Sequence, residues 1–234
     1  RQHFTPKSLL ALLKDTALDR GDGRQLKHGA ARYARSMGKP ETAMTVKGLE
    51  LPAYDPRGAY GMALGYAVAT RGGCHLRAYP ISHEILRKPV ATDRFSFSGK
   101  ARIIKIAEDL NAVVDSLTAC KFTFFAAGME EYARALHAVT GNPVTAGDLL
   151  DVGEKIIYNE RIINSLNGVD ARHDTLPDRF FDQPGTGCDR FFVPPIDRTA
   201  FLSARSAYYA VRELTEDGRP RQDTARRLGI DRHG

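Results

Sequence analysis

One histidine of this sequence lies in a setting that suits acid–base chemistry. His75 ends the run Arg71-Gly72-Gly73-Cys74-His75, where two glycines permit backbone angles that let the main chain approach a ligand closely. Imidazole exchanges protons near neutral pH, so His75 can act as a general acid or base, or hydrogen-bond an oxo or hydroxo ligand. A histidine that hydrogen-bonds within a structural turn fits the same run equally well.

A carboxylate and a thiol form the second candidate. Asp115 and Cys120 follow a long segment with an apolar face. A buried carboxylate needs hydrogen-bond donors, which a heterocycle rich in N–H groups supplies, and a thiolate is a soft ligand suited to iron–sulfur clusters. A cluster needs several thiolates, and Cys74, Cys120 and Cys188 are too scattered to supply them. The residues alone therefore favour Cys120 as a small buried apolar side chain.

Other catalytic classes find no support in the sequence. His83, His137 and His173 lack the close spacing of a zinc-binding helix such as HExxH. A serine hydrolase would need a GxSxG elbow, and the glycine-rich stretch 58–65 has neither the lysine of a P-loop nor a strand before it. Zinc, serine-hydrolase and P-loop chemistry are thus excluded.

Composition indicates an ordinary globular protein. The chain is 42% hydrophobic and 26% charged, which argues against a disordered or fibrous protein. Its net charge is +6, and residues 1–50 hold ten Lys and Arg against five Asp and Glu, but no basic stripe with interleaved aromatics marks a nucleic-acid module. We therefore expect no nucleic-acid partner.

The spacing of the cysteines and the hydropathy of the chain indicate the cellular compartment that we expect. Three widely spaced cysteines predict no disulfide framework and favour a reducing cytoplasm. The sequence begins at Arg1 and shows neither a signal-peptide core nor an apolar run long enough for a bilayer. We expect a cytoplasmic fragment or processed chain with no membrane partner.

Apolar side chains recur mostly with a helical period, which predicts a mainly α, multihelical fold. Cap signals support this, because Thr5-Pro6, Asp55-Pro56, Asp197 and the pair Thr145 and Asp148 each precede such a segment. Helices are expected at residues 5–21, 25–38, 58–69, 99–114, 129–139, 145–166 and 197–214, with a short one at the end of the chain.

Small residues dominate the expected helix at 58–69. Gly58, Gly61 and Gly65 alternate with alanines there, and each glycine lowers helix propensity by about 1 kcal/mol. Another backbone or a bulky ligand must lie against such a surface, and tight helix packing is as good an explanation as a ligand. Pro89 interrupts the periodicity in the loop 87–98, which predicts two domains, 1–90 and 91–234.

Several segments closely resemble the aldehyde ferredoxin oxidoreductase family. These are 46–58 (VKGLELPAYDPRG), 71–77 (RGGCHLR), 115–122 (DSLTACKF), similar to the family's D-x-x-G-L-C motif, and 174–180 (DTLPDRF), followed by Tyr208-Tyr209. The resemblance covers nearly the whole chain and implies the helical C-terminal domains of that family, a pterin-facing part in 1–90 and a part carrying the cysteine motif in 91–234.

The resemblance implies a cofactor and a reaction. In this family an N-terminal domain binds tungsten or molybdenum on two pterins and supplies cysteines to a 4Fe-4S cluster. Cys120 would be the cluster's remaining thiolate, Asp115, Arg71 and Cys74 would contact the cofactor, and His75 would be the catalytic residue beside the metal. The implied reaction oxidises small aldehydes to carboxylic acids and passes electrons through the cluster to ferredoxin.

The resemblance also implies partners and limits. An N-terminal pterin-binding domain or subunit would be a partner, a homodimer is possible in this family, and the chain alone would be inactive. Thr118-Ala119 stand where the family has Gly-Leu. Asn164 to Gly168 depart from the stretch bearing phenylalanine and arginine that is usual in the family. These departures keep open the alternative of a non-catalytic helical interaction module or a decayed remnant of the family.

Overall fold

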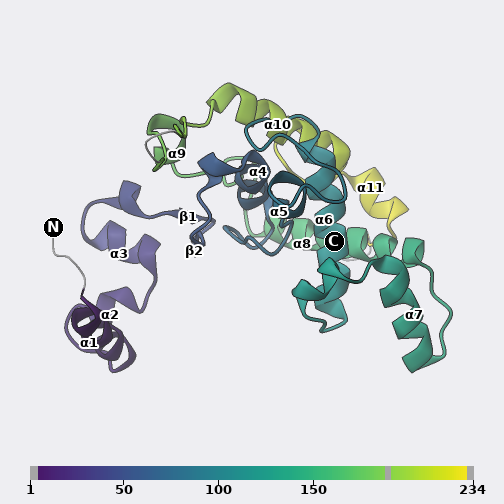
Figure 1. Ribbon diagram of the computed structural model, residues 1–234, viewed down its shortest axis with the longest axis horizontal. Coiled ribbons are helices and arrows are strands. Elements are labelled where there is room, and N and C mark those ends of the chain that lie inside the picture. Colours follow the sequence, from purple (N-terminus) through teal and green to yellow (C-terminus); the bar gives the residue numbers. More distant parts are fainter. Residues whose placement is uncertain (1–4, 188–190, 231–234) are drawn as a thin grey trace.

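The computed structural model describes residues 5–187 and 191–230, so Cys188 lies outside the described residues. The mainly α prediction is confirmed, since helices dominate the described chain and its one sheet is a short antiparallel hairpin (Figure 1). The helices are α1 (Pro6–Ala17), α2 (Gly23–Leu26), α3 (Ala30–Ser36), α4 (Tyr60–Val68), α5 (Ile81–Glu84), α6 (Lys100–Ser116), α7 (Met129–Thr140), α8 (Ala146–Leu166), α9 (Arg179–Asp182), α10 (Arg198–Val211) and α11 (Gln222–Arg227). The hairpin is β1 (Thr45–Val46) and β2 (Leu49–Glu50), and 3-10 turns are η1 (Pro40–Thr42), η2 (Pro56–Gly58) and η3 (Lys121–Phe125).

Four long helices, α6, α7, α8 and α10, begin and end within three residues of the ranges predicted for them. Their starts follow the capping chemistry of the sequence. The amide of Asp148 donates to the Thr145 hydroxyl at 3.1 Å, and the Thr145 amide donates back to the Asp148 carboxylate at 2.8 Å. Asp197 likewise accepts from the amide of Ala200 at 2.6 Å at the start of α10.

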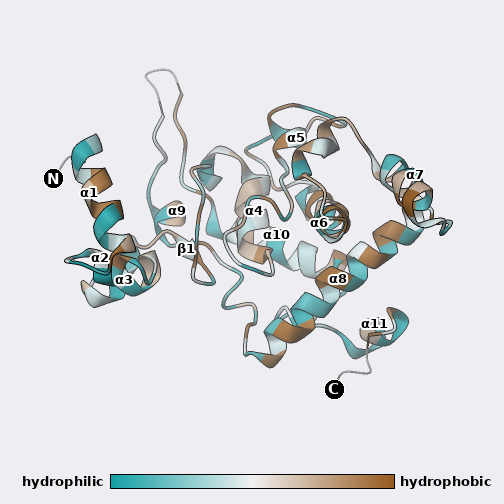
Figure 2. Ribbon diagram, turned by 90° about the horizontal axis from the view of Figure 1, so that it is seen from below, coloured by the Kyte–Doolittle hydropathy of each residue, from teal (hydrophilic) through white to brown (hydrophobic). Residues whose placement is uncertain are grey.

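The N-terminal region departs from the prediction in two ways. The helix expected at 25–38 is two short helices, α2 and α3, because Gly29 at φ +88° breaks the chain between them. In α1, no residue is buried, and Leu10 is 67% exposed. The lobe of α1, α2 and α3 stands apart from the main body, with apolar residues of α1 at its surface (Figures 1 and 2).

Helix α4 is the centre of the main body. All nine of its residues are buried, and a Cβ added to Gly61 would lie 2.9 Å from the Glu84 carboxylate. That carboxylate accepts from the Gly61 amide at 2.7 Å and pairs with the ammonium of Lys100 at 2.8 Å. Tight packing, with side chains of α5 and α6 against the small residues of α4, therefore explains the glycines of this segment.

Three clusters of buried side chains form the core. One joins α4 to Leu176, Phe180 and Phe201, the second joins α4 and α6 to Tyr158 and Tyr208, and the third lies among α6, α7 and α8. The first two draw residues from both sides of position 90. A division into domains 1–90 and 91–234 therefore stays a prediction.

Buried charges tie the long helices together. Arg212, fully buried after α10, pairs with Glu108 of α6 at 2.7 Å and also with Asp109. Arg161 of α8 and Lys47 of the hairpin each pair with Asp174 at 2.7 Å. We call these residues the buried charge network. Since an unpaired buried charge is very costly, each member requires its partners for the fold.

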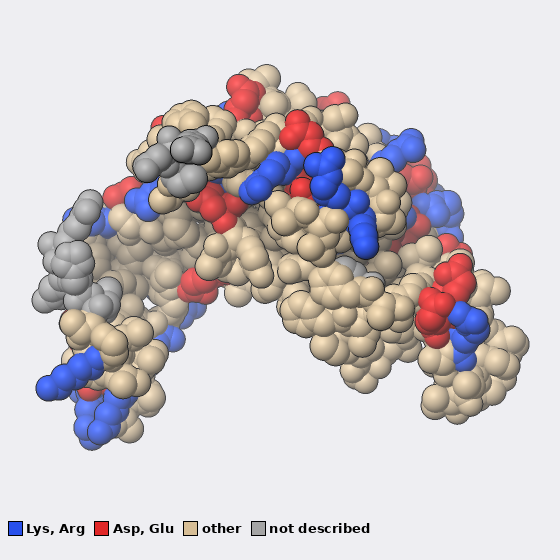
Figure 3. Space-filling model, viewed as in Figure 1, with Lys and Arg blue, Asp and Glu red and all other residues tan. Residues whose placement is uncertain are grey.

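The surface of the molecule carries charges of both signs. Acidic and basic side chains are interspersed along the upper part of the arched face seen in Figure 3, whereas its lower centre is largely uncharged. Lys and Arg gather at the tip of the lobe formed by α1, α2 and α3. Among the described residues, no helix has the length and apolar character needed to span a membrane.

Candidate cofactor-facing site

The loop that carries His75 leaves α4 and turns over the hairpin. Gly72 has φ +102°, and a Cβ there would lie 2.4 Å from the Val46 carbonyl oxygen. The amide of Gly73 donates to the same oxygen at 3.2 Å, and its own Cβ would lie 2.7 Å from the Leu51 side chain. Packing against the hairpin therefore requires both glycines. The same packing fixes the position of the backbone that leads to His75.

The turn that carries Cys120 follows α6. After Ser116 the chain reverses at Thr118, whose φ is +53°, and enters η3 at Lys121. Asp115 and Cys120 are both exposed. The expectation that Cys120 is a buried apolar side chain is wrong, because the reversal at Thr118 turns the chain outward to the surface.

Lys121 joins the loop to the turn. Its ammonium donates to the Leu76 carbonyl oxygen at 2.9 Å and to the Asp115 carboxylate at 3.0 Å. The structure therefore brings the His75 loop beside the turn of Asp115 and Cys120, although some forty residues separate them in sequence. We call Arg71, Cys74, His75, Asp115 and Cys120 the site surface.

Arg77 makes a second connection between the same segments. One guanidinium nitrogen lies 3.4 Å from the Asp115 carboxylate, and another pairs with Glu160 of α8. Glu160 also accepts from the Thr70 hydroxyl at 2.5 Å. The remaining Nε of Arg77 is buried and hydrogen-bonds no residue in the described ranges, so a donor at this site is left without an acceptor.

The environment of His75 favours its neutral form. Burial lowers the pKa of the imidazole, and the positive charges of Arg71 and Lys121 lower it further. The pKa of Lys121 is lowered as well, first by burial and then by Arg71 and Arg77, although Asp115 opposes this. A neutral imidazole at pH 7 can accept a proton, as a general base must.

Arg71 and Cys74 differ in what they offer a ligand. Arg71 is exposed, and its positive charge lowers the pKa of His75 and of Lys121. Cys74 is half-buried, and its sulfur accepts from the amide of Leu76 at 3.4 Å. Arg71 is therefore available for an anionic group, whereas the sulfur of Cys74 supports its own loop.

The sequence did not single out Arg77, Lys121 or Tyr54. Tyr54 lies 5.5 Å from His75 between ring centroids. All three stand inside or beside the segments that carry the family resemblance, which is the signal by which they could have been found. Their importance comes from contacts between segments, which spacing along the chain does not reveal.

The described residues hold no complete metal site. Nowhere in the described ranges do three or more His, Cys, Asp or Glu side chains gather closely enough to bind a metal ion. Cys120 can supply one ligand, so a cluster would need the others from outside this chain.

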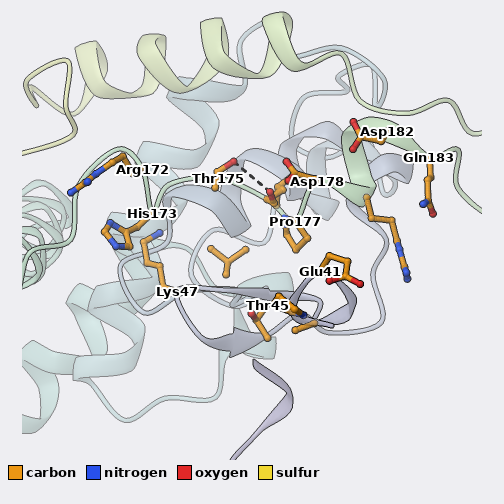
Figure 4. A pocket seen from close by; sticks show the side chains of 15 residues that line it. Glu41, Thr45, Lys47, Arg172, His173, Thr175, Pro177, Asp178, Asp182 and Gln183 are labelled. Carbon is orange, nitrogen blue, oxygen red and sulfur yellow. Dashed lines mark hydrogen bonds between the residues drawn. The ribbon is translucent and has the colours of Figure 1, made fainter. Parts of the chain in front are cut away.

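A separate pocket of about 480 Å³ lies between the hairpin and residues 172–183 (Figure 4). No member of the site surface lines it. Its Lys47 ammonium is engaged with Asp174 at 2.7 Å and with the Ala67 carbonyl oxygen at 2.5 Å, and its His173 lies 3.2 Å from Asp170. These groups serve the scaffold, so the pocket is a weaker candidate for chemistry than the site surface.

Comparisons with known proteins identify the family of the chain. Residues 3–230 match the family model for aldehyde ferredoxin oxidoreductase, domains 2 and 3. The chain is 43% identical over 213 residues to the tungsten-containing aldehyde ferredoxin oxidoreductase of Pyrococcus furiosus, and 41% identical over 211 residues to that of Thermococcus kodakarensis. These matches cover 90% and 89% of this chain, and 34% of each relative.

A solved structure shows the same fold. The chain superposes on the active site complex BamBC of benzoyl coenzyme A reductase, in complex with 1,5-dienoyl-CoA, with a TM-score of 0.69. The match covers 96% of this chain and 39% of that one, at 14% identity. The chain thus spans about a third of its relatives and belongs to the aldehyde ferredoxin oxidoreductase family, as that family's domains 2 and 3.

Proposed function

We propose that this chain is the part of an aldehyde ferredoxin oxidoreductase that covers a tungsten–pterin cofactor and a 4Fe-4S cluster. The enzyme would oxidise a small aldehyde to the carboxylic acid and pass electrons to ferredoxin. The observation that carries the proposal is the meeting of the His75 loop with the Asp115–Cys120 turn through Lys121. The cofactor-bearing domain would complete the site, and the chain alone would be inactive.

The side chains present fit such a cofactor as one half of its site. Cys120 is an exposed thiol, as a cluster ligand shared with another domain must be. Both Lys121 and Arg77 approach the same oxygen of Asp115, Oδ2, which leaves Oδ1 free to accept from N–H groups of a pterin. The exposed guanidinium of Arg71 suits an oxygen acceptor.

Each residue of the site surface has a separate task in this proposal. The cofactor, when bound, supplies the two-electron chemistry. His75 accepts a proton from the reacting group through its neutral imidazole, Asp115 and Arg71 orient the pterin, and Cys120 ligates the cluster. Cys74 would contact the cofactor, and its sulfur, which accepts from the Leu76 amide, would also help to hold the loop of His75.

Tungsten is favoured over molybdenum because the relatives that match this chain are tungsten-containing enzymes. A cytoplasmic setting, ferredoxin as electron acceptor and a homodimer remain parts of the proposal that follow from family membership.

The alternative of a non-catalytic module rests on Thr118-Ala119. Thr118 has φ +53°, and it stands where the family motif has glycine, the residue that adopts this conformation without strain. The chain therefore keeps the turn of the family motif despite the backbone strain at Thr118, and Cys120 still lies at the surface. This favours a working cofactor site over a decayed remnant.

The proposal can be tested by joining this chain to the N-terminal portion of the Pyrococcus furiosus relative. We expect the joined protein, produced with tungstate, to reduce ferredoxin or a viologen dye in the presence of a simple aldehyde. His75→Gln should abolish turnover while retaining the metals, and Tyr33→Phe on α3 serves as the matched control. Absence of turnover in a joined protein that contains tungsten and iron would refute the assignment.

A further inference from the structure

The imidazole of His75 packs against two phenol rings. Its centroid lies 5.5 Å from that of Tyr54 and 6.0 Å from that of Tyr79, and the two tyrosine rings are 6.5 Å apart at 82°. Such separations are typical of favourable aromatic pairs. Within the described ranges no hydrogen bond to either ring nitrogen of His75 is present, so these two rings are what orients the imidazole.

Tyr79 occupies a backbone conformation that disfavours its own side chain. Its φ is +41°, in the left-handed region where a bulky residue is a true outlier. Pro80 follows it, and a residue before proline is further restricted to extended conformations. Strain of this kind persists where the surrounding structure enforces it, and often at functional sites. Glycine or asparagine would fit the backbone better, but neither has an aromatic ring.

The ring of Tyr79 meets the other tyrosine of the group, Tyr54, edge to face. Burial raises the pKa of the Tyr79 hydroxyl, and the neighbouring Tyr54 raises it further. The main chain of Tyr54 is held in turn, because the Tyr66 hydroxyl on buried α4 donates to the Tyr54 carbonyl oxygen at 3.1 Å. Tyr54 itself is 45% exposed, so burial does little to fix the position of its ring.

We propose that Tyr79 is a positioning residue for His75. Its ring packs on the imidazole and, edge to face, on the ring of Tyr54, which contacts the same imidazole. The inference rests on the proposed function only in taking His75 as the proton acceptor. The strained backbone of Tyr79 is then the cost of placing an aromatic ring at this one position beside the base.

The test uses the full chain with ¹⁵N- and ¹³C-labelled histidine, in which His75→Gln identifies the His75 signals among the seven histidines. Tyr79→Phe keeps the ring and removes the hydroxyl. Tyr79→Asn removes the ring and places a residue tolerant of positive φ. Tyr33→Phe, on α3, is the control. Two quantities are measured, the pKa of His75 and the nuclear Overhauser contacts from its ring to Tyr54.

In Tyr79→Asn we expect the pKa of His75 to rise, because burial is the main cause of its depression, while Arg71 and Lys121 continue to lower it. The contacts from His75 to Tyr54 should be lost in Tyr79→Asn, whereas Tyr79→Phe, which retains the ring, should keep both the contacts and the pKa. In the joined protein, the acidic limb of the pH profile of kcat/KM should move to higher pH in Tyr79→Asn.

An unchanged pKa and unchanged contacts in folded Tyr79→Asn would overturn the inference. If that variant fails to fold, Tyr79→Leu decides, because it also removes the aromatic ring, and contacts between His75 and Tyr54 at full strength would overturn the inference equally. Neither spectroscopic readout needs a cofactor or turnover. Failure of the joined protein to bind metal would therefore count against the proposed function alone.

Discussion

Two regions of this molecule hold charged side chains at opposite extremes of exposure. In the buried charge network, Arg212, Arg161 and Asp174 are at most 3% exposed, and each has opposite charges in contact. On the site surface, Asp115 and Cys120 are exposed, and the contacts of Asp115 occupy only one of its oxygens. Each charged side chain of the network has an oppositely charged partner within the chain, whereas the site surface holds exposed groups that a partner can reach.

This contrast separates residues that hold the fold from residues that act on a ligand. A change in the network should cost stability, because it strands a charge in the core. A change on the site surface should cost little stability and should remove function, because the groups there are exposed or half-buried.

The largest effect on stability is expected from Arg212→Met. The change leaves Glu108 and Asp109 buried without their guanidinium partner, and breaking a buried pair typically costs about 3–5 kcal/mol. Chemical denaturation measures the loss in free energy of unfolding. Arg227→Met, which breaks a half-exposed pair with Glu213, should cost no more than about 1 kcal/mol. Similar losses in the two variants would contradict the contrast.

A second effect is a dependence on pH. Burial alone would raise the pKa of Asp174, but Arg161 and Lys47 outweigh it and hold the pKa below its ordinary value of 3.8. A depressed pKa stabilises the fold fully above the ordinary value and loses that contribution as pH falls below it. Asp174→Asn should therefore be much less stable than wild type at pH 7, with a gap that narrows below about pH 4.

Denaturation curves at several pH values test this expectation. Asp178→Asn, which changes an exposed carboxylate paired with Arg198, is the matched control and should track wild type at every pH. A gap for Asp174→Asn that stays constant, or widens, in acid would show that the network does not work through the charge of Asp174.

A smaller effect, of opposite sign, is expected from Thr118→Gly. Thr118 at φ +53° is a strained β-branched residue, and glycine relieves a left-handed conformation by about 1 kcal/mol. Glycine also restores the family motif. The melting temperature should rise, whereas Thr140→Gly, within α7, should lower it. A fall in melting temperature for Thr118→Gly would mean that its side chain contributes more than the strain costs.

Much of the fold followed from local patterns. Capping residues and apolar periodicity located α6, α7, α8 and α10, because these signals act within a few residues of each helix end. The same signals failed in the N-terminal lobe, where Gly29 splits a periodic segment and the apolar side of α1 meets no core. Periodicity predicts that a helix has an apolar face, but it does not identify what covers that face.

The sequence predicted some residues of the site and missed others. His75, Asp115 and Cys120 were chosen mainly through family resemblance, since their spacing carries little signal. Lys121 and Tyr79 matter because the fold brings distant segments together, and no local pattern records such a contact. The burial expected for Cys120 was wrong because a single residue with positive φ redirected the chain.

The smallest change in stability is expected from Cys120→Ser, within about 0.5 kcal/mol, because the thiol is exposed. The same change gives the most direct test of the central claim when this chain is joined to the N-terminal portion of the Pyrococcus furiosus relative. Elemental analysis of iron and tungsten in the purified protein is the measurement. We predict both metals in the parent and a loss of iron in Cys120→Ser. Equal iron in the two proteins, or no metal in the parent, would contradict the account.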